Sequence, residues 1–203
     1  MRKFLWINPV AAEMYDSPEL RETLANKGFE IVACRQDHIA AVKKKYQLAV
    51  ETARSCVADM RCPMAVSYIK RNYAPDFLEY PDIEPILIHC ARELHERLSE
   101  KGFLYITTPC AALRELGNSI GLPKARFYTW AEFARREAIP LRKKALDRSP
   151  IPPGFFAEYG KEAGVLDSRN KIDLYFSNLL DPAEKKVLEL LYCPCGCHHG
   201  DGV

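Results

Sequence analysis

Short apolar runs alternate with amphipathic segments along most of this 203-residue chain. Residues 3–8 (KFLWIN), 29–34 (FEIVAC) and 103–109 (FLYITTP) are typical of strands, whereas 83–102 has apolar residues at helical spacing. Strands that alternate with helices form parallel sheets, because each helix returns the chain to the edge where the next strand begins. The sequence therefore predicts an α/β fold with a mainly parallel sheet flanked by helices.

Two long helices are predicted with a defined buried face. The helix expected over 37–54 would bury one stripe of side chains, formed by Ile39, Val42, Tyr46 and Val50. The helix within 83–102 would bury a second stripe, formed by Leu87, Ala91, Leu94 and Leu98.

The last third of the chain is less regular. Residues 140–164 are rich in Pro and Gly and predict a connection dominated by loops. Residues 171–180 (KIDLYFSNLL) and 187–192 (VLELLY) are strand-like, and the helix start DPAEKK lies at 181–186 between them. The second of these strands runs directly into the cysteine-rich tail.

Length and charge limit the organisation and the partners. We expect a single domain over 1–203, or two small lobes at 1–140 and 141–203, the second holding the connection and the tail. Hydrophobic residues make up 48% and charged residues 28%, as in a folded globular protein. A net charge of +2 gives no sign of nucleic-acid binding. There is no apolar run long enough for a membrane span and no secretory signal, so we expect a cytoplasmic protein.

The positions of the cysteines indicate a metal site. Cys62 and Cys110 each follow a predicted strand and open a helix, and Cys193 follows the strand at 187–192. Residues just past the carboxyl ends of parallel strands gather at one rim of a sheet. Helix N-termini also stabilise thiolates and anionic groups. We therefore expect these three cysteines to share a site with Cys197, which lies four residues beyond Cys193.

Four thiolates suit a [4Fe–4S] cluster, and zinc is the competing ion. A zinc site would favour two local pairs of ligands, and only the tail offers one. Cys195, His198 and His199 are further candidate ligands. Cys195 could otherwise be a spare thiol or a redox partner, and the two histidines could be donors of hydrogen bonds to the cluster sulfurs or solvated tail residues.

The remaining cysteines and histidines favour packing roles. Small buried hydrophobes are the simpler interpretation for Cys34, Cys56 and Cys90, and surface or packing residues for His38, His89 and His95. Because the chain lacks a phosphate-binding loop, a dinucleotide fingerprint and a nucleophile elbow, nucleotide-dependent and hydrolase functions have little support.

Three segments resemble the cysteine motifs of the catalytic domain of [FeFe] hydrogenases. The segments are RCPMAVSYIKRNYAP, FLYITTPCAALREL and VLELLYCPCGCHHGDG, and their order matches the family's T-S-C-C-P, P-C-x-x-K and C-x-G-G-C-x-x-G-G. The resemblance spans residues 56–202 and leaves the first 50 unplaced. It implies that Cys62, Cys110, Cys193 and Cys197 hold a [4Fe–4S] cluster and that Cys197 bridges to a two-iron centre.

Departures from these motifs argue against hydrogen chemistry. Arg61 stands where the family has a proton-relaying cysteine, and it could serve as a counter-charge to an anionic cluster or as a surface residue. Leu113 replaces the lysine that holds a cyanide of the two-iron centre, and Cys195 replaces a glycine. The chain is also shorter than the family pattern. We therefore expect a reduced second lobe and do not expect a two-iron centre.

We therefore expect an iron–sulfur protein for electron transfer, redox sensing or cluster trafficking. A minimal or modified [FeFe] hydrogenase and a zinc-stabilised interaction module are the alternatives. The expected partners are a redox or iron–sulfur protein and a second chain, identical or different, that covers the C-terminal tail. Nucleic acid and membrane are not expected as partners.

Overall fold

The computed structural model describes residues 1–141, 144–177 and 185–203, which form two units. Each unit contains one four-stranded sheet, and all neighbouring strands described are parallel. The predicted α/β class with parallel strands flanked by helices is thus confirmed, with two sheets in place of one.

Both units are discontinuous in sequence, unlike the lobes at 1–140 and 141–203 expected above. Unit 1 comprises Met1–Gln36, Leu87–Ile151 and Cys197–Val203. Unit 2 comprises Asp37–Ile86 and Pro152–Gly196. Early and late parts of the chain therefore contribute to each unit.

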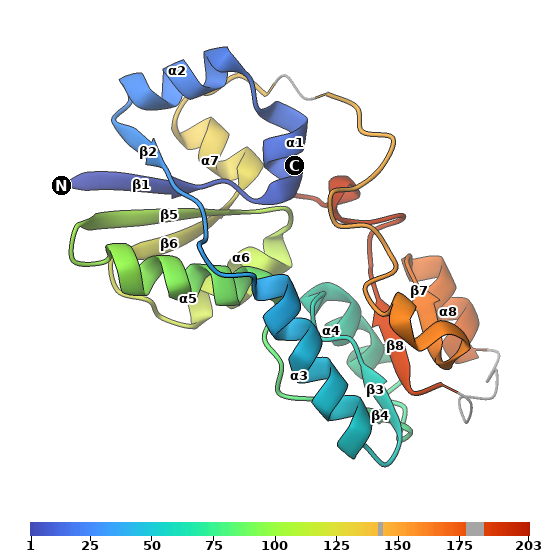
Figure 1. The fold of residues 1–203 in the computed structure, drawn as a ribbon. Coiled ribbons are helices and arrows are strands. Elements are labelled where there is room, and N and C mark those ends of the chain that lie inside the picture. Colours follow the sequence, from blue (N-terminus) through green and yellow to red (C-terminus); the bar gives the residue numbers. More distant parts are fainter. Residues whose placement is uncertain (142–143, 178–184) are drawn as a thin grey trace. The chain divides into compact units, whose positions relative to one another are not determined.

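The sheet of unit 1 has the strand order β2-β1-β5-β6. Its strands are β1 (Arg2–Trp6), β2 (Phe29–Ile31), β5 (Gly102–Thr108) and β6 (Ala125–Thr129). One face is covered by α1 (Pro9–Tyr15), α2 (Pro18–Asn26) and α7 (Trp130–Arg136), the other by α5 (Ile86–Leu98) and α6 (Ala111–Ser119) (Figure 1).

Side chains that alternate along these strands build the core on both faces. Leu5 and Tyr105 pack with Trp130 and Phe133 on the face that α1, α2 and α7 cover. On the opposite face, α6 approaches β6 so closely that Gly117 lies directly against the ring of Phe127.

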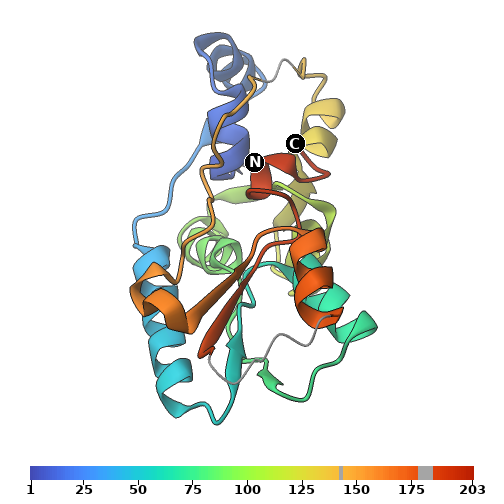
Figure 2. The same cartoon turned by 90° about the vertical axis from the view of Figure 1, so that its right-hand side faces the viewer.

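The sheet of unit 2 has the order β4-β3-β8-β7 (Figure 2). Its strands are β3 (Cys56–Ala58), β4 (Leu78–Glu79), β7 (Ala163–Leu166) and β8 (Val187–Leu190). They are flanked by α3 (His38–Thr52), α4 (Pro63–Asn72), α8 (Arg169–Ser177) and the 3-10 helix η1 (Ala157–Glu162). Val57 and Val187 face α3, whereas Ala58 and Leu188 face α4 and α8.

Several elements differ from the sequence prediction. The strand expected over 171–180 is wrong where the structure describes it: α8 covers Arg169–Ser177 and buries Ile172 and Phe176, four residues apart. Part of the helix start at 181–186 lies outside the described residues. In α3, Val42 and Tyr46 are buried as predicted, but Ile39 is 56% exposed.

The apolar stripe predicted for 83–102 is confirmed, because all four of its members are buried in α5: Leu87, Ala91, Leu94 and Leu98. Among the described helices, none is long and apolar enough to cross a membrane.

A methyl group at Gly117 should destabilise unit 1. Gly to Ala inside a helix ordinarily stabilises by about 0.5–1 kcal/mol. Here the new Cβ would overlap the buried Phe127 ring, so we expect Gly117→Ala to lower the free energy of unfolding by about 1–3 kcal/mol. Urea denaturation measures the change. Ser119→Ala, at an exposed position of the same helix, is the control and should stay close to wild type.

Candidate functional site

The four predicted cluster ligands are divided equally between the two units. Cys62 and Cys193 belong to unit 2, and Cys110 and Cys197 belong to unit 1. The expectation that three strand ends of one sheet deliver Cys62, Cys110 and Cys193 is therefore corrected: β3 and β8 are neighbours in one sheet, but β5 belongs to the other.

Cys62 follows β3 and is the N-cap residue of α4, with Pro63 in the first turn. Burial raises the pKa of the Cys62 thiol, and the nearby backbone N–H groups of Ala65, Tyr192 and Met64 act in the opposite direction. The Cys62 side chain makes no capping hydrogen bond to α4. A half-buried sulfur close to amide N–H groups suits a thiolate whose charge is balanced by a metal.

Arg61, next to Cys62, forms a buried ionic network in unit 2. Its guanidinium contacts the carboxylates of Asp59 at 2.7 Å and Glu189 at 3.0 Å, and it stacks 3.7 Å from the ring centroid of Phe155. Burial alone would lower the pKa of Arg61, but the two carboxylates raise it above its ordinary value. A surface role for Arg61 is thus wrong, and its charge is already balanced by two acids.

Further hydrogen bonds satisfy the carboxylate oxygens of this network. Glu189 accepts from the N–H groups of Gly154 at 2.8 Å and Phe155 at 3.1 Å. Asp59 accepts from the Arg61 N–H at 2.9 Å and the Tyr46 hydroxyl at 3.3 Å. The network therefore fixes the loop that leads from β3 to Cys62.

The segment Cys193–Gly196 forms a tight turn. The Gly196 N–H donates to the Cys193 carbonyl at 3.3 Å, and Cys195 has a φ of 58°. Pro at the second position and a left-handed residue at the third are the pattern of a type II turn. Cys195 is exposed, and its N–H donates a hydrogen bond to the Asp167 carbonyl at 3.1 Å. The turn thus directs Cys195 to the surface.

Residues 197–203 pack within unit 1 on the loop that carries Cys110. Asp201 accepts a 2.9 Å hydrogen bond from the N–H of Ala111, the first residue of α6. The Gly202 N–H donates to the Pro109 carbonyl at 3.1 Å. A Cβ at Gly200 would overlap that same carbonyl oxygen, so this close approach requires glycine. Cys110 and Cys197 are therefore carried by segments in direct contact.

The two tail histidines have different surroundings. His198 is buried and His199 is exposed, and their rings lie 3.9 Å apart between centroids. The interpretation as solvated tail residues is thus wrong for His198.

A second pair of potential metal-binding side chains was not predicted. Cys34 and Cys90, both in unit 1, place their sulfur atoms within 4.8 Å of one another. A hydrogen bond from Cys90 lowers the pKa of Cys34, and the same bond raises that of Cys90.

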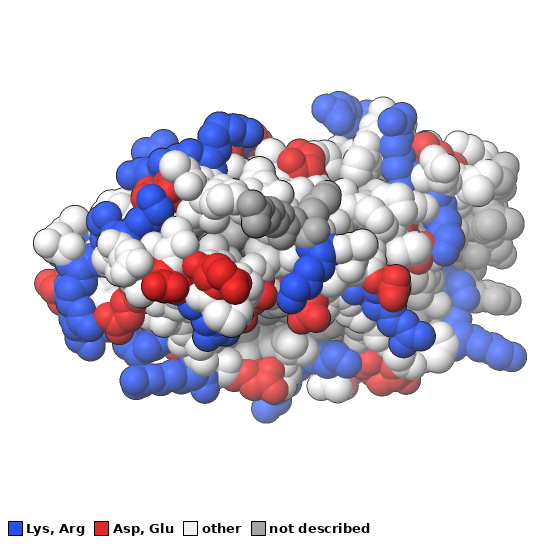
Figure 3. Space-filling model, turned by 90° about the horizontal axis from the view of Figure 1, so that it is seen from above, with Lys and Arg blue, Asp and Glu red and all other residues white. Residues whose placement is uncertain are grey.

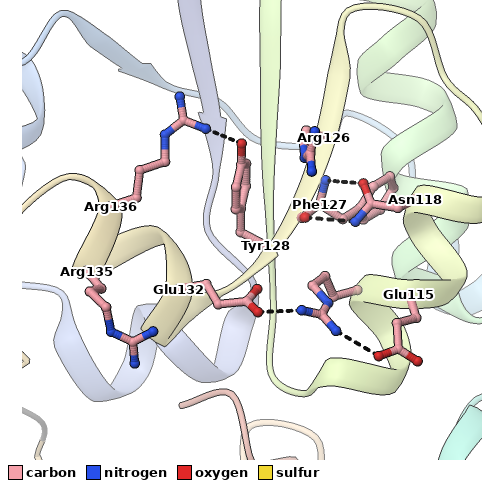
Figure 4. A pocket seen from close by; sticks show the side chains of 9 residues that line it. Glu115, Asn118, Arg126, Phe127, Tyr128, Glu132, Arg135 and Arg136 are labelled. Atoms are coloured by element: carbon pink, nitrogen blue, oxygen red, sulfur yellow. Dashed lines mark hydrogen bonds and ion pairs between the residues drawn. The ribbon is translucent and has the colours of Figure 1, made fainter.

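Unit 1 also contains an open pocket of about 650 Å³ (Figure 4). Arg114 pairs with Glu115 and Glu132, and Arg136 bonds the Tyr128 hydroxyl. Four arginines and two glutamates line the pocket, and this excess of positive charge favours an acidic ligand. None of the candidate metal ligands lines this pocket. Elsewhere, Lys and Arg are interspersed with Asp and Glu on the face shown in Figure 3.

No protein-family model and no curated protein matches this chain.

Removing the Arg61 charge should strongly destabilise unit 2. Arg61→Met would leave the buried carboxylates of Asp59 and Glu189 without a cation, and we expect a loss of about 3–5 kcal/mol in unfolding free energy. The matched control is Arg2→Met at the exposed Arg2–Glu30 pair, which should cost less than about 1 kcal/mol. Equal losses in the two variants, measured by urea denaturation, would contradict the role of the network.

Proposed function

We propose that this protein binds one [4Fe–4S] cluster through Cys62, Cys110, Cys193 and Cys197, and that it serves in electron transfer, redox sensing or cluster trafficking. The observation that carries the proposal is the position of Cys62, which follows β3 and begins α4, with a half-buried sulfur near backbone N–H groups. Amide N–H groups near the sulfurs stabilise the thiolates of an iron–sulfur cluster and raise its reduction potential.

The other three cysteines support the proposal by their placement. Cys193 follows β8, the direct neighbour of β3 in a parallel sheet, so Cys62 and Cys193 leave the same edge of that sheet. Cys110 follows β5 and is the N-cap residue of α6, and Cys197 begins the tail segment that packs on the same loop within unit 1.

The resemblance to the [FeFe] hydrogenase catalytic domain is part of this proposal, without hydrogen turnover. Arg61 occupies the position of the proton-relaying cysteine, but it is paired with two buried acids, and its raised pKa prevents it from releasing a proton near neutral pH. Leu113 is a buried apolar residue of α6 and offers no charge to a cyanide ligand. These two residues favour cluster binding over catalysis.

Cluster binding can be tested on anaerobically purified full-length protein. We expect about four irons and four sulfides per chain, and an electron paramagnetic resonance signal after reduction. Cys110→Ser should lose this iron, because a cluster ligand is removed. The matched control is Cys195→Ser, which replaces an exposed cysteine outside the ligand set and should keep full iron content.

Three results would contradict the proposal. Full iron content in Cys110→Ser would refute the ligand assignment. Iron-free protein whose zinc is lost in Cys110→Ser would favour the zinc-stabilised module. Infrared bands of CO and cyanide would show a two-iron centre and favour a hydrogenase.

A further inference from the structure

Cys34 and Cys90 lie side by side in unit 1, and neither belongs to the proposed set of cluster ligands. Their sulfur atoms lie within 4.8 Å of one another. The bond between the two sulfurs of a disulfide is about 2.05 Å long, so the thiols would need to approach by up to roughly 2.7 Å. Rotation about the two Cα–Cβ bonds can supply this movement without a change of fold.

Cys90 shares one side of α5 with two charged residues. Cys90, Glu93 and Arg97 follow one another at intervals of three and four residues, which places them along the same side of the helix. Cys90 is buried and the Glu93 side chain is only 8% exposed, so this side of α5 is covered. Part of the cover is the segment that contains Cys34.

That segment is bound to α5 on both sides of Cys34. The Glu93 carboxylate accepts the N–H group of Arg35 at 3.0 Å. The Arg97 guanidinium donates to the Ala33 carbonyl at 2.6 Å. Because these bonds involve the residues directly before and after Cys34, they hold its backbone beside the helix that carries the second thiol.

The two thiols differ in their access to solvent. Cys34 is half-buried and lies in irregular backbone after β2, whereas Cys90 is only 8% exposed within a helix. The hydrogen bond from Cys90 lowers the pKa of Cys34, and the Arg97 charge acts in the same direction, against burial and Glu93. An accessible thiol of lowered pKa beside a second thiol is the arrangement of redox-sensitive cysteines.

We propose that Cys34 and Cys90 form a reversible disulfide by exchange with a low-molecular-weight disulfide, and that Cys34 reacts first. The Cys34 thiolate attacks one sulfur of the external disulfide RS–SR, which gives a mixed disulfide and releases RS⁻. The Cys90 sulfur, after loss of its proton, attacks the Cys34 sulfur and expels the second RS⁻. Two protein thiols are oxidised, RS–SR is reduced, and the two thiol protons leave in two RSH.

The place of this pair in the chain gives the bond a structural consequence. Two sulfurs are complete for a disulfide, whereas they supply only half of the four ligands of a structural zinc site. The chain leaves unit 1 after Gln36 and re-enters it at Leu87, close in sequence to the two cysteines. The disulfide would therefore close segment 37–86 into a covalent loop.

Peptide mapping of full-length protein tests the proposal. Anaerobically purified protein is incubated with oxidised glutathione, and the remaining thiols are alkylated in denaturant. Trypsin then places Cys34 in peptide 28–35 and Cys90 in peptide 72–92. We expect these peptides as one linked pair that dithiothreitol separates. The internal control is Cys56 in peptide 55–61, whose burial raises its pKa to about 12, and which should carry no glutathione.

Two variants test the order of the steps, and circular dichroism verifies that both fold. In Cys90→Ser the mixed disulfide meets no second thiol, so Cys34 should keep glutathione. In Cys34→Ser the buried Cys90 should lose the link and carry no glutathione. Cys110→Ser should form the same link as wild type, because the bond does not depend on the proposed cluster.

Three results would overturn the proposal. The first is wild-type protein whose two peptides stay unlinked. The second is a link that joins two chains, seen as a dimer on a non-reducing denaturing gel. The third is Cys90→Ser protein in which Cys34 carries no glutathione. Iron content does not enter any of these readouts, so the disulfide and the cluster can fail separately.

Discussion

Parallel strand pairing is the constraint on which the rest of this structure depends. Two parallel neighbours cannot be joined by a tight hairpin, so the chain must cross over before it returns to the same edge. In unit 2, β3 pairs with β8, although most of the chain separates them in sequence. The pairing therefore brings the residues after both strands, including Cys62 and Cys193, to one edge. In unit 1, β5 leads in the same way into Cys110 at the start of α6.

Local patterns predicted the elements whose periodicity is strong. The stripe in α5 was correct because four apolar residues recur over three turns, a pattern that a strand cannot use. The strand prediction over 171–180 was wrong because a short apolar run fits a strand and a buried helix equally well. Strands β4 and β7 have only two and four residues, too few to show alternation. The division into two sheets depends on pairing partners, which no local pattern encodes.

For the candidate sites too, the sequence predicted local features but not contacts between distant residues. Cys62 and Cys110 were found because each sits at a junction between a strand and a helix, which is a local feature. Cys90 was interpreted as a packing residue because its position within a helix is all that the sequence shows. Only the tertiary fold of unit 1 brings it to Cys34. The buried partners of Arg61 were missed for that reason too: Glu189 lies 128 residues away.

The segments that carry Cys62 and Cys34 are each held in place by side-chain carboxylates. Near Cys62 the carboxylates belong to a buried ion pair, which is costly to desolvate and is tolerated only because amide, guanidinium and hydroxyl donors satisfy them. Near Cys34 the Glu93 carboxylate, whose side chain is 8% exposed, accepts the N–H of Arg35 at 3.0 Å.

The charge balance around Cys62 depends on its polar neighbours. Backbone N–H groups near the Cys62 sulfur would offset part of the negative charge that four thiolates bring to a cluster. The Arg61 guanidinium adds no net positive charge to this balance, because Asp59 and Glu189 already pair with it. Charge balance at Cys62 would therefore depend on the amide N–H groups rather than on the neighbouring cation.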